Sequence, residues 1–325
     1  MSPAQNAEPL DLSIIIVNYN TGELLAACLE SIYAQQTALS LEVLVVDNYS
    51  NDGSAQMVRE RFGDVLLFAN QCNLGFVRAN NRAIERSRGR RLLLLNPDTV
   101  VPPGTLERLV QFLDSSSGAG IVGCKQVDGQ GRIQLTWGRF PTVLSEIQRK
   151  SRHMRMSLDD SAVRTALEDN LNGTCNVDWV AGSCMLVRRE VVDKIGPMDE
   201  NIFMYFEDID WCRRAREAGF RVCIDSQTQI VHFGGESAAT DKITSLIEYR
   251  RSQFYFLRKY RGRLFGLLTR LWVLFKSLGY LSLWAVRYWY RGDPEERYEA
   301  ECMALVYKNI AALALTGRLP AKIEH

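Results

Sequence analysis

The chain has 325 residues, of which 46% are hydrophobic, and its formal net charge is +1. This length allows one large α/β domain with an appendage or two modest domains. The near-neutral charge argues against a general polyanion-binding protein. The eight cysteines form no C-x-x-C pair, so they indicate neither a zinc site nor a disulfide framework and favour the cytoplasm.

Apolar runs separated by short helical patterns predict a mostly parallel sheet flanked by helices. We expect residues 1–11 to be a flexible leader, because they are polar and lack the apolar core of a signal peptide. The expected strands are 12–20, 41–46, 65–69 and the leucine run 92–95, and the expected helices between them are 23–35, 54–62 and 79–87. This alternation is typical of a parallel sheet with right-handed crossovers.

Polar side chains lie at the carboxyl ends of three of these strands: Asn18 and Asn20, then Asp47, then Asn96 and Asp98. Because ligands bind at the carboxyl ends of the strands in open α/β sheets, we expect a polar ligand with hydroxyls and charge there. Asp98 is expected to be solvated, to stay ionised and to hold a divalent cation. The alternative is that Asp98 only caps the next turn.

Two common nucleotide-binding motifs are absent from the chain. The turn after the first strand is not G-x-G-x-x-G, and no G-x-x-x-x-G-K-[ST] loop occurs. This disfavours a nicotinamide dehydrogenase, the obvious alternative for such a sheet. A bound pyrophosphate would therefore need another neutralising group, and a cation on Asp98 would provide one.

The next part of the chain is less regular. A helix is expected within 100–114 and a strand at 121–124, followed by an irregular polar stretch over 128–176. This stretch carries a basic cluster of Arg149, Lys150, Arg152, His153 and Arg155. We interpret it as a mobile insertion on the acceptor side or, equally, as a solvated loop. A strand interrupted by small residues is then expected over 177–187.

Three carboxylates follow the aromatic run that begins at Phe203: Glu207, Asp208 and Asp210. Acids at the start of a helix suit its dipole, so a capping role is one interpretation. Mutual repulsion beside aromatic walls should, however, raise at least one pKa. A carboxylate tuned in this way can act as a general base. His232 precedes two glycines, and we consider both a structural role and a phosphate- or metal-binding role for it.

Residues 241–325 are basic and aromatic and are expected to be helical. No acid occurs between Glu248 and Asp293, whereas arginine, tryptophan and leucine are frequent. Arg270, Lys276 and Arg287 are expected to leave the apolar run short of the ~20 residues that span a bilayer. We therefore predict a module that lies on an anionic membrane surface, with an oligomer interface as the alternative and no nucleic acid as partner.

Several blocks together resemble the family-2 inverting glycosyltransferases of the GT-A fold, and more narrowly the rhamnosyltransferases of bacterial cell-surface glycan synthesis. The blocks are Ile14–Asn20, Val45–Asn48, Asn73–Phe76 with Ala79–Asn81, and Leu95–Asp98. The resemblance implies a catalytic domain over 12–240, with a nucleotide-sugar half at 12–127 and an acceptor half at 128–240. One departure is that the family's D-x-D motif reads Asn-Pro-Asp here, which implies fewer charged ligands for the metal.

The resemblance also implies roles for individual residues. Asp208 is the expected base, Glu207 its orienting partner, and Asp98 and His232 the ligands of Mn²⁺ or Mg²⁺. The expected donor-binding residues are Val17, Asn18, Tyr19, Asn20, Asp47, Asn73, Gly75, Arg78 and Asn96. The expected acceptor-binding residues are Trp179, Gly182 and Ser183.

The expected reaction is inverting transfer of a sugar, favouring rhamnose from dTDP-rhamnose, to a hydroxyl of a lipid-linked or polysaccharide acceptor. UDP-hexose or UDP-galactofuranose is the alternative donor. A sugar-phosphate nucleotidylyltransferase would need a glycine- and lysine-rich phosphate loop, and a non-catalytic scaffold would not need the Glu207–Asp208 pair. The expected location is the inner face of the cytoplasmic membrane.

Overall fold

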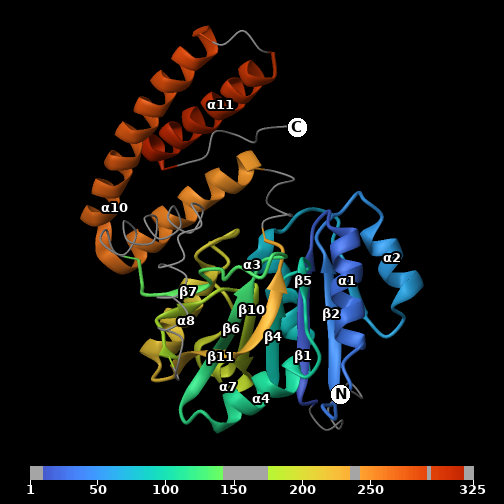
Figure 1. Cartoon of the computed structure of the whole chain (residues 1–325). Coiled ribbons are helices and arrows are strands. Elements are labelled where there is room, and N and C mark those ends of the chain that lie inside the picture. The colour runs from blue at the N-terminus through green and yellow to red at the C-terminus, as the bar shows by residue number, and fades with distance from the viewer. Residues whose placement is uncertain (1–9, 142–174, 235–241, 291–293, 318–325) are drawn as a thin grey trace. The chain divides into compact units, whose positions relative to one another are not determined.

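The computed structural model describes residues 10–141, 175–234, 242–290 and 294–317 (Figure 1). The chain divides into two compact units. The sheet unit comprises residues 1–200 and 207–237, and the helical unit comprises residues 201–206 and 238–325. The expected basic cluster at 149–155 lies outside the described residues.

The first half of the sheet unit has the predicted βα rhythm. Its strands are β1 (Leu12–Asn18), β2 (Leu41–Asp47), β3 (Leu66–Ala69) and β4 (Arg91–Leu95), and its helices are α1 (Gly22–Tyr33), α2 (Ser54–Arg61) and α3 (Gly75–Arg86). The strands are parallel, in the order β3-β2-β1-β4. Asn18 pairs with Asp47 in the register, so the polar ends of β1 and β2 lie next to each other.

The second half completes a nine-stranded sheet in the order β3-β2-β1-β4-β10-β6-β11-β5, with β8 paired to β11. Its elements are β5 (Thr99–Val100), α4 (Thr105–Ser115), β6 (Ala119–Val127), β8 (Cys175–Asn176), β9 (Trp179–Val180), β10 (Cys184–Arg188), α7 (Arg189–Ile195), α8 (Glu207–Glu217) and β11 (Arg221–His232). A separate short pair joins β9 to β7 (Trp137–Gly138). Strand β10 is antiparallel and lies between β4 and β6.

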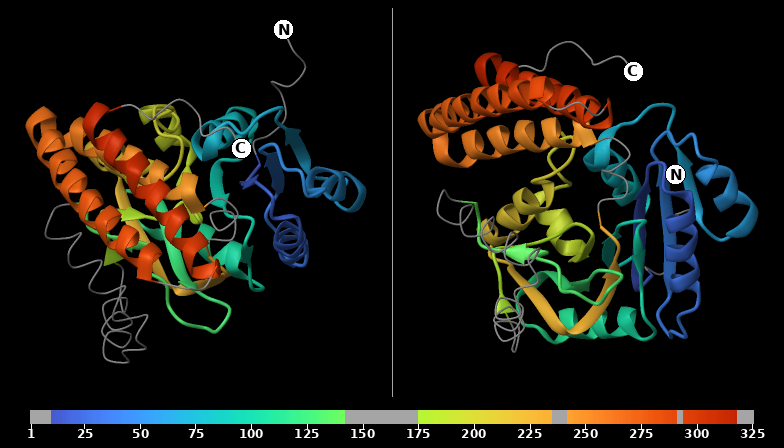
Figure 2. Two further views of the ribbon diagram at one scale, coloured as in Figure 1. Left: turned by 90° about the horizontal axis from the view of Figure 1, so that it is seen from above. Right: turned by 45° about the horizontal axis from the view of Figure 1, so that its top comes forward.

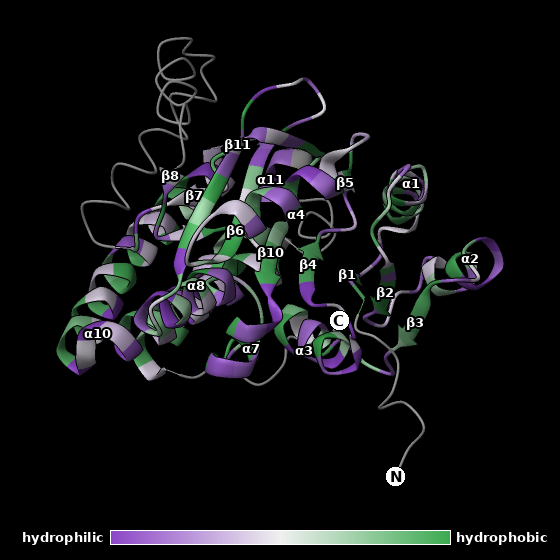
Figure 3. Ribbon diagram, turned by 90° about the horizontal axis from the view of Figure 1, so that it is seen from below, coloured by the Kyte–Doolittle hydropathy of each residue, from purple (hydrophilic) through white to green (hydrophobic). Residues whose placement is uncertain are grey.

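The core lies on both faces of the sheet, as the unbroken leucine run of β4 predicts. Leu92 to Leu95 are at most 2% exposed. Leu93 and Leu95 belong to a cluster that includes apolar residues of α1, α2 and α4. Successive side chains of a strand point to opposite faces, so Leu92 and Leu94 face away from this cluster. Figure 3 shows the hydrophobic colouring of the central strands β4, β6 and β10.

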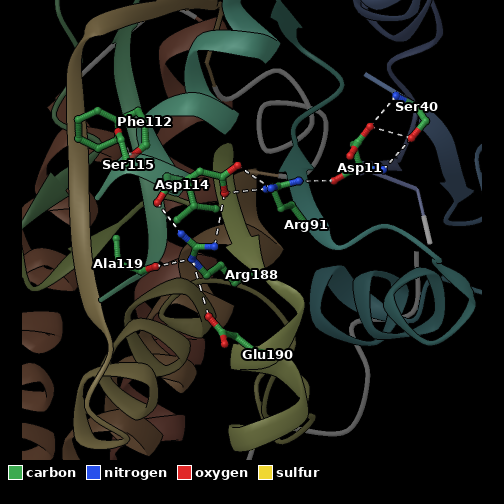
Figure 4. A network of polar contacts seen from close by, with 10 residues as sticks. Asp11, Ser40, Arg91, Phe112, Asp114, Ser115, Ala119, Arg188 and Glu190 are labelled. Carbon is green, nitrogen blue, oxygen red and sulfur yellow. Dashed lines mark hydrogen bonds and ion pairs between the residues drawn. The ribbon is translucent and has the colours of Figure 1, made fainter. Parts of the chain in front are cut away.

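A network of hydrogen bonds and ion pairs stabilises the sheet where β4 begins, at the end opposite to the polar strand ends (Figure 4). Arg91 begins β4 and pairs with Arg188 at the end of β10. Asp114 of α4 accepts hydrogen bonds from Arg91 Nε at 3.0 Å and from Arg188 Nη1 at 3.4 Å. Arg188 also donates to the carbonyl oxygens of Leu113 and Ala119. The shared carboxylate explains how two arginines can lie side by side at this edge.

The helical unit consists mainly of α10 (Lys242–Tyr290) and α11 (Pro294–Thr316), which pack side by side (Figure 2). Gly262, at φ 85°, breaks the helical conformation within α10. Phe254, before the break, and Val273, after it, share one apolar cluster with Val306 and Ile310 of α11. Residues 300–315 are thus helical, as predicted.

Helix α10 differs from the sequence prediction in one respect. The segment Ile243–Tyr290 contains an 18-residue window with a mean hydropathy of 1.3 and no more than two charged residues. By length and composition alone this helix could cross a membrane, and only 17% of the window is buried. The expectation that charged residues leave the run too short was therefore wrong, since two charges do not lower the mean hydropathy enough.

Candidate active site

The ends of β1 and β2 form a hydrogen-bonded loop pair. The Asn18 amide donates to Asp47 Oδ1 and to Ser50 Oγ, each at 3.1 Å, and its oxygen accepts from Thr21 Oγ1 at 2.7 Å. Asp47 Oδ2 accepts from the Ser50 backbone N–H. Asn18 is fully buried and Asp47 is 3% exposed. Both side chains therefore hold the two loops together, which leaves the neighbouring Tyr19 as the more accessible side chain of the β1 end.

A second network orders the loop before α3. The Asn48 amide donates to Asn73 Oδ1 at 2.7 Å, and its oxygen accepts from the Leu74 backbone N–H at 2.9 Å. Asn73 Oδ1 also accepts from the Gly75 N–H at 2.9 Å. Gly75 has φ 80°, a conformation that glycine adopts without steric cost. The loop is thus fixed against the end of β2, although its Asn73 stays exposed.

Asp98 and His232 lie together, although 134 positions separate them in the chain. The short strand β5 pairs with the end of β11, with Thr99 opposite His232, and the Phe233 N–H donates to the Asp98 carbonyl at 2.9 Å. This pairing places His232 Nε2 3.3 Å from Asp98 Oδ1. The Asn96 amide nitrogen lies 3.5 Å from the same Nε2.

Asp98 is only 3% exposed, so the expectation of a solvated carboxylate was wrong. The β5–β11 pairing covers it, and a sequence pattern does not show such a long-range contact. Asp98 Oδ1 is buried and has no hydrogen-bond donor among the described residues. A buried anionic oxygen without a donor fits a cation, and His232 adds a nitrogen ligand. The described residues contain no group of three or more His, Cys, Asp or Glu that could hold a metal. A cation here would thus need further ligands from a bound anion or water.

The turn between β9 and β10 connects Asp208 to the end of β4. The Asn96 N–H donates to the Ser183 carbonyl at 3.1 Å, which extends the β4–β10 pairing by one residue. The neighbouring Gly182 N–H donates instead to α8, to Asp208 Oδ2 at 3.3 Å. A Cβ on Gly182 would lie 3.9 Å from the Asp208 Cβ and 3.5 Å from the Phe76 ring. The backbone of Gly182–Ser183 thus links Asp208 to the same sheet edge as Asn96.

Two of the expected acceptor-binding side chains are engaged within the protein. Trp179 is 9% exposed and its indole N–H donates to the Arg139 carbonyl at 3.0 Å. Ser183 is 7% exposed and its hydroxyl donates to Gln126 Oε1 at 2.9 Å. Their contacts define the shape of the turn that carries Gly182.

The three carboxylates at the start of α8 have different surroundings. Glu207 is 7% exposed, and burial, followed by the nearby charge of Asp208, raises its pKa well above the usual value. Asp210 is fully buried and accepts from Arg214 Nε at 2.9 Å, an ion pair within the helix. Asp208 is more accessible than either of them. The predicted rise in a pKa therefore occurs at Glu207, and burial rather than repulsion is its main cause.

Arg78 provides an exposed cation on α3. Its Nε lies 3.5 Å from Glu200 Oε2, and both side chains are more than half exposed. Exposed ion pairs contribute little to stability, so Arg78 can exchange Glu200 for an anionic ligand at small cost. The strand ends thus carry the hydrogen-bonded loops after β1 and β2 and the exposed guanidinium of Arg78. They also carry the buried Asp98–His232 pair and the more accessible carboxylate of Asp208.

The fold is that of the GT-A glycosyltransferases. Its solved relatives include a mannosyltransferase from Pyrobaculum calidifontis in complex with GDP-Man and Mn²⁺, with a TM-score of 0.53, 18% identity and coverage of 97% of this chain and 78% of that one. A second is GalNAc-T7 with UDP, GalNAc and Mn²⁺, with a TM-score of 0.54, 15% identity and coverage of 76% and 48%.

The family model "Glycosyltransferase like family 2" matches residues 9–262. The chain belongs to this family of glycosyltransferases. An N-acetylglucosaminyl-diphospho-decaprenol L-rhamnosyltransferase of Mycobacterium tuberculosis is 27% identical over 264 residues, which cover 76% of this chain and 83% of the relative. The low-salt glycan biosynthesis hexosyltransferase Agl10 of Haloferax volcanii is 28% identical over 225 residues, covering 68% and 66%. The resemblance found in the sequence is thereby confirmed.

Sequence reasoning missed the residues that hold the site in place. Ser50 joins the β1 and β2 loops, and Asn48 orders the loop before α3. Gln134 contacts both the ring and the backbone of His232. Ser50 and Asn48 stand beside Asp47 at a strand end, which was a usable signal. Gln134 lies in an irregular stretch with no motif, so nothing in the sequence pointed to it.

Proposed function

We propose that this protein is an inverting, metal-dependent glycosyltransferase that moves a sugar from a nucleoside diphosphate to an acceptor hydroxyl. The observation that carries the proposal is the link between Asp208 and the end of β4 through Gly182 and Ser183. This link joins the Asp208 carboxylate, through the backbone of Gly182 and Ser183, to the edge of the sheet at which Asp98 and His232 lie. A base and an anion-binding group are the two elements that displacement of a nucleoside diphosphate needs.

In this proposal the β1 and β2 loops bind the nucleoside. Tyr19 and Asn20 supply the accessible contacts, whereas Asn18 and Asp47 hold the loops in their shape. Residues Val17, Asn73, Gly75 and Asn96 line the same strand ends and complete the donor site. Arg78 releases Glu200 and pairs with a phosphate, for which an arginine is well suited.

Asp98 and His232 would hold Mn²⁺ or Mg²⁺. When bound, such a cation neutralises the diphosphate and assists its departure as a Lewis acid. Asp208 removes the proton from the acceptor hydroxyl, which attacks the anomeric carbon from the face opposite to the leaving group. Its hydrogen bond from Gly182 orients the carboxylate. Burial raises the pKa of the neighbouring Glu207, which favours the neutral form of that acid and so limits repulsion between the two acids.

The L-rhamnosyltransferase relative supports rhamnose as the sugar and a lipid-linked acceptor, and we propose dTDP-rhamnose as the donor. The hexosyltransferase relative supports a hexose as the second candidate sugar, for which we propose a UDP-linked donor. Thermal shift of the full chain with dTDP-rhamnose, UDP-glucose and UDP-galactose, each with Mn²⁺ or with EDTA, tests the assignment. We expect the largest stabilisation with dTDP-rhamnose and Mn²⁺; no shift with any of the donors would contradict a nucleotide-sugar site.

We further propose that α10 attaches the enzyme to the inner surface of an anionic membrane. After Gly262 its exposed apolar side chains recur at helical spacing and include Leu264, Leu268, Trp272, Phe275 and Trp289. Lys276 and Arg287 lie over the rings of Tyr280 and Trp284, as cations do beside interfacial aromatic residues. Apolar and cationic side chains on one helix match an anionic lipid surface. A second copy of the chain is the alternative occupant.

A further inference from the structure

Gln134 lies beside His232 because the chain reverses after β6. Residues 128–132 form a turn in which Asp128 Oδ1 accepts from the N–H groups of Gln130 and Arg132. The returning chain then pairs with β6, and the Gln134 N–H donates to the Gln126 carbonyl at 2.8 Å. Gln126 is 1% exposed, so this anchor is buried. The position of Gln134 is therefore set by backbone contacts.

The orientation of the Gln134 amide is fixed by His232 itself. Its nitrogen donates to the His232 carbonyl oxygen at 2.8 Å. The reverse orientation would place two oxygens against each other without a proton between them, which is repulsive. Gly234, at φ 81°, permits the approach, because a Cβ there would lie 3.3 Å from the amide nitrogen. Gln134 Oε1 must consequently face the imidazole ring.

This orientation determines which ring nitrogen carries the proton. Gln134 Oε1 lies 2.8 Å from His232 Nδ1, and a carbonyl oxygen can only accept, so Nδ1 is the donor. In neutral imidazole the other nitrogen, Nε2, then carries the lone pair, and the Asn96 amide nitrogen lies 3.5 Å from it as a long-range donor. Nε2 lies 3.3 Å from Asp98 Oδ1, whose lone pairs lack a donor among the described residues. Two lone pairs at this distance repel unless a positive charge lies beside them.

We propose that Gln134 is a positioning residue that keeps the proton of His232 on Nδ1 and so presents Nε2, together with Asp98, as a pair of ligands for a divalent cation. The metal-binding part of this inference rests on the proposed function, whereas the assignment of the His232 proton to Nδ1 does not. Gln134 contacts the ring on the side away from Asp98, as a partner of a metal-binding histidine does. Its removal frees the ring to rotate and to carry the proton on Nε2.

Three variants of the full chain separate this role from a general structural one. Gln134→Leu removes both the acceptor and the donor, whereas Gln134→Glu removes only the donor to the His232 carbonyl oxygen and keeps an acceptor for Nδ1–H. Gln130→Leu is the matched control, since the Gln130 side chain is exposed in the adjacent turn. Proton–nitrogen NMR correlation spectra of the metal-free protein report the tautomer, with His232→Ala to assign the signal. The loss of free Mn²⁺ signal in electron paramagnetic resonance reports metal affinity.

We expect wild type, Gln130→Leu and Gln134→Glu to show the Nδ1–H form, and Gln134→Leu to lose it. Loss of an outer partner of a metal ligand typically weakens binding about 10- to 100-fold, and we expect this for Mn²⁺ in Gln134→Leu only. An Nε2–H tautomer in the wild type would overturn the inference, as would unchanged tautomer and Mn²⁺ affinity in Gln134→Leu. If the wild type binds no Mn²⁺ but its tautomer depends on Gln134, the positioning role stands and the metal in the proposed function fails.

Discussion

Replacing Asp208 by asparagine separates its chemical role from its structural one. Asp208 accepts from the Gly182 N–H at 3.3 Å and from the Ile209 N–H at 2.7 Å. Asparagine has one acceptor oxygen, which can keep the shorter of these two bonds, so the longer of the two is lost. A hydrogen bond contributes about 0.5–1.5 kcal/mol, and we expect a loss of stability in or below this range.

The expected effect on catalysis is larger than the effect on stability. A positioned general base accelerates a reaction by about 10²- to 10⁴-fold, which corresponds to about 2.7–5.4 kcal/mol of barrier. The Asp208→Asn variant should lose activity by this factor and bind the donor as the wild type does. Single-turnover release of nucleoside diphosphate and calorimetric titration with the donor measure the two quantities. The control is Glu217→Gln, an exposed acid at the other end of α8.

Equal losses of turnover and donor affinity in Asp208→Asn would refute the assignment of Asp208 as the base. A loss of activity matched by global unfolding would refute the stability estimate. Full activity would exclude proton removal by this carboxylate altogether.

Three further predictions concern other parts of the account. Glu207 has a raised native pKa, so its contribution to stability is complete below the unfolded pKa of about 4.3 and is lost as pH rises through the native pKa. Wild type should therefore lose stability relative to Glu207→Gln over that window in urea titrations, and parallel pH profiles would contradict this. Asp98→Ala should abolish the Mn²⁺ dependence of donor binding, and wild-type binding that is indifferent to EDTA would exclude the metal. Replacing Trp272 and Phe275 by glutamate should release the protein from vesicles containing anionic lipid; unchanged sedimentation with vesicles would contradict membrane attachment by α10.

The sequence predicts the first half of the sheet well because local patterns determine it. Each apolar run ends in polar residues or proline, and apolar residues recur at helical spacing in the segments between these runs. The strands, the helices and the parallel direction of the strands therefore follow from the local sequence. The polar ends of β1 and β2 meet in the structure, where Asn18 lies opposite Asp47. The carboxylates at the start of α8 were also visible, because three acids within four residues are unusual.

Long-range pairing decides the rest, and no local pattern reports it. The insertion of antiparallel β10 between β4 and β6 brings Ser183 to Asn96. The pairing of β5 with β11 buries Asp98 beside His232. The role of Asn18 in holding the loops could not be read from its position at a strand end. A polar residue at the end of a strand can face either a ligand or the neighbouring loop, and the sequence is the same in both cases.

An assay of the complete reaction tests most directly whether this chain transfers sugars as proposed. Full-length protein is incubated with Mn²⁺, dTDP-rhamnose and a lipid-linked N-acetylglucosaminyl diphosphate, and the product is analysed by NMR for the configuration of the new bond. We predict stoichiometric release of dTDP and an anomeric configuration opposite to that of the donor. Retention of configuration would contradict direct attack by a hydroxyl activated by Asp208. Failure to form product from this or any UDP-hexose donor would contradict the transferase assignment.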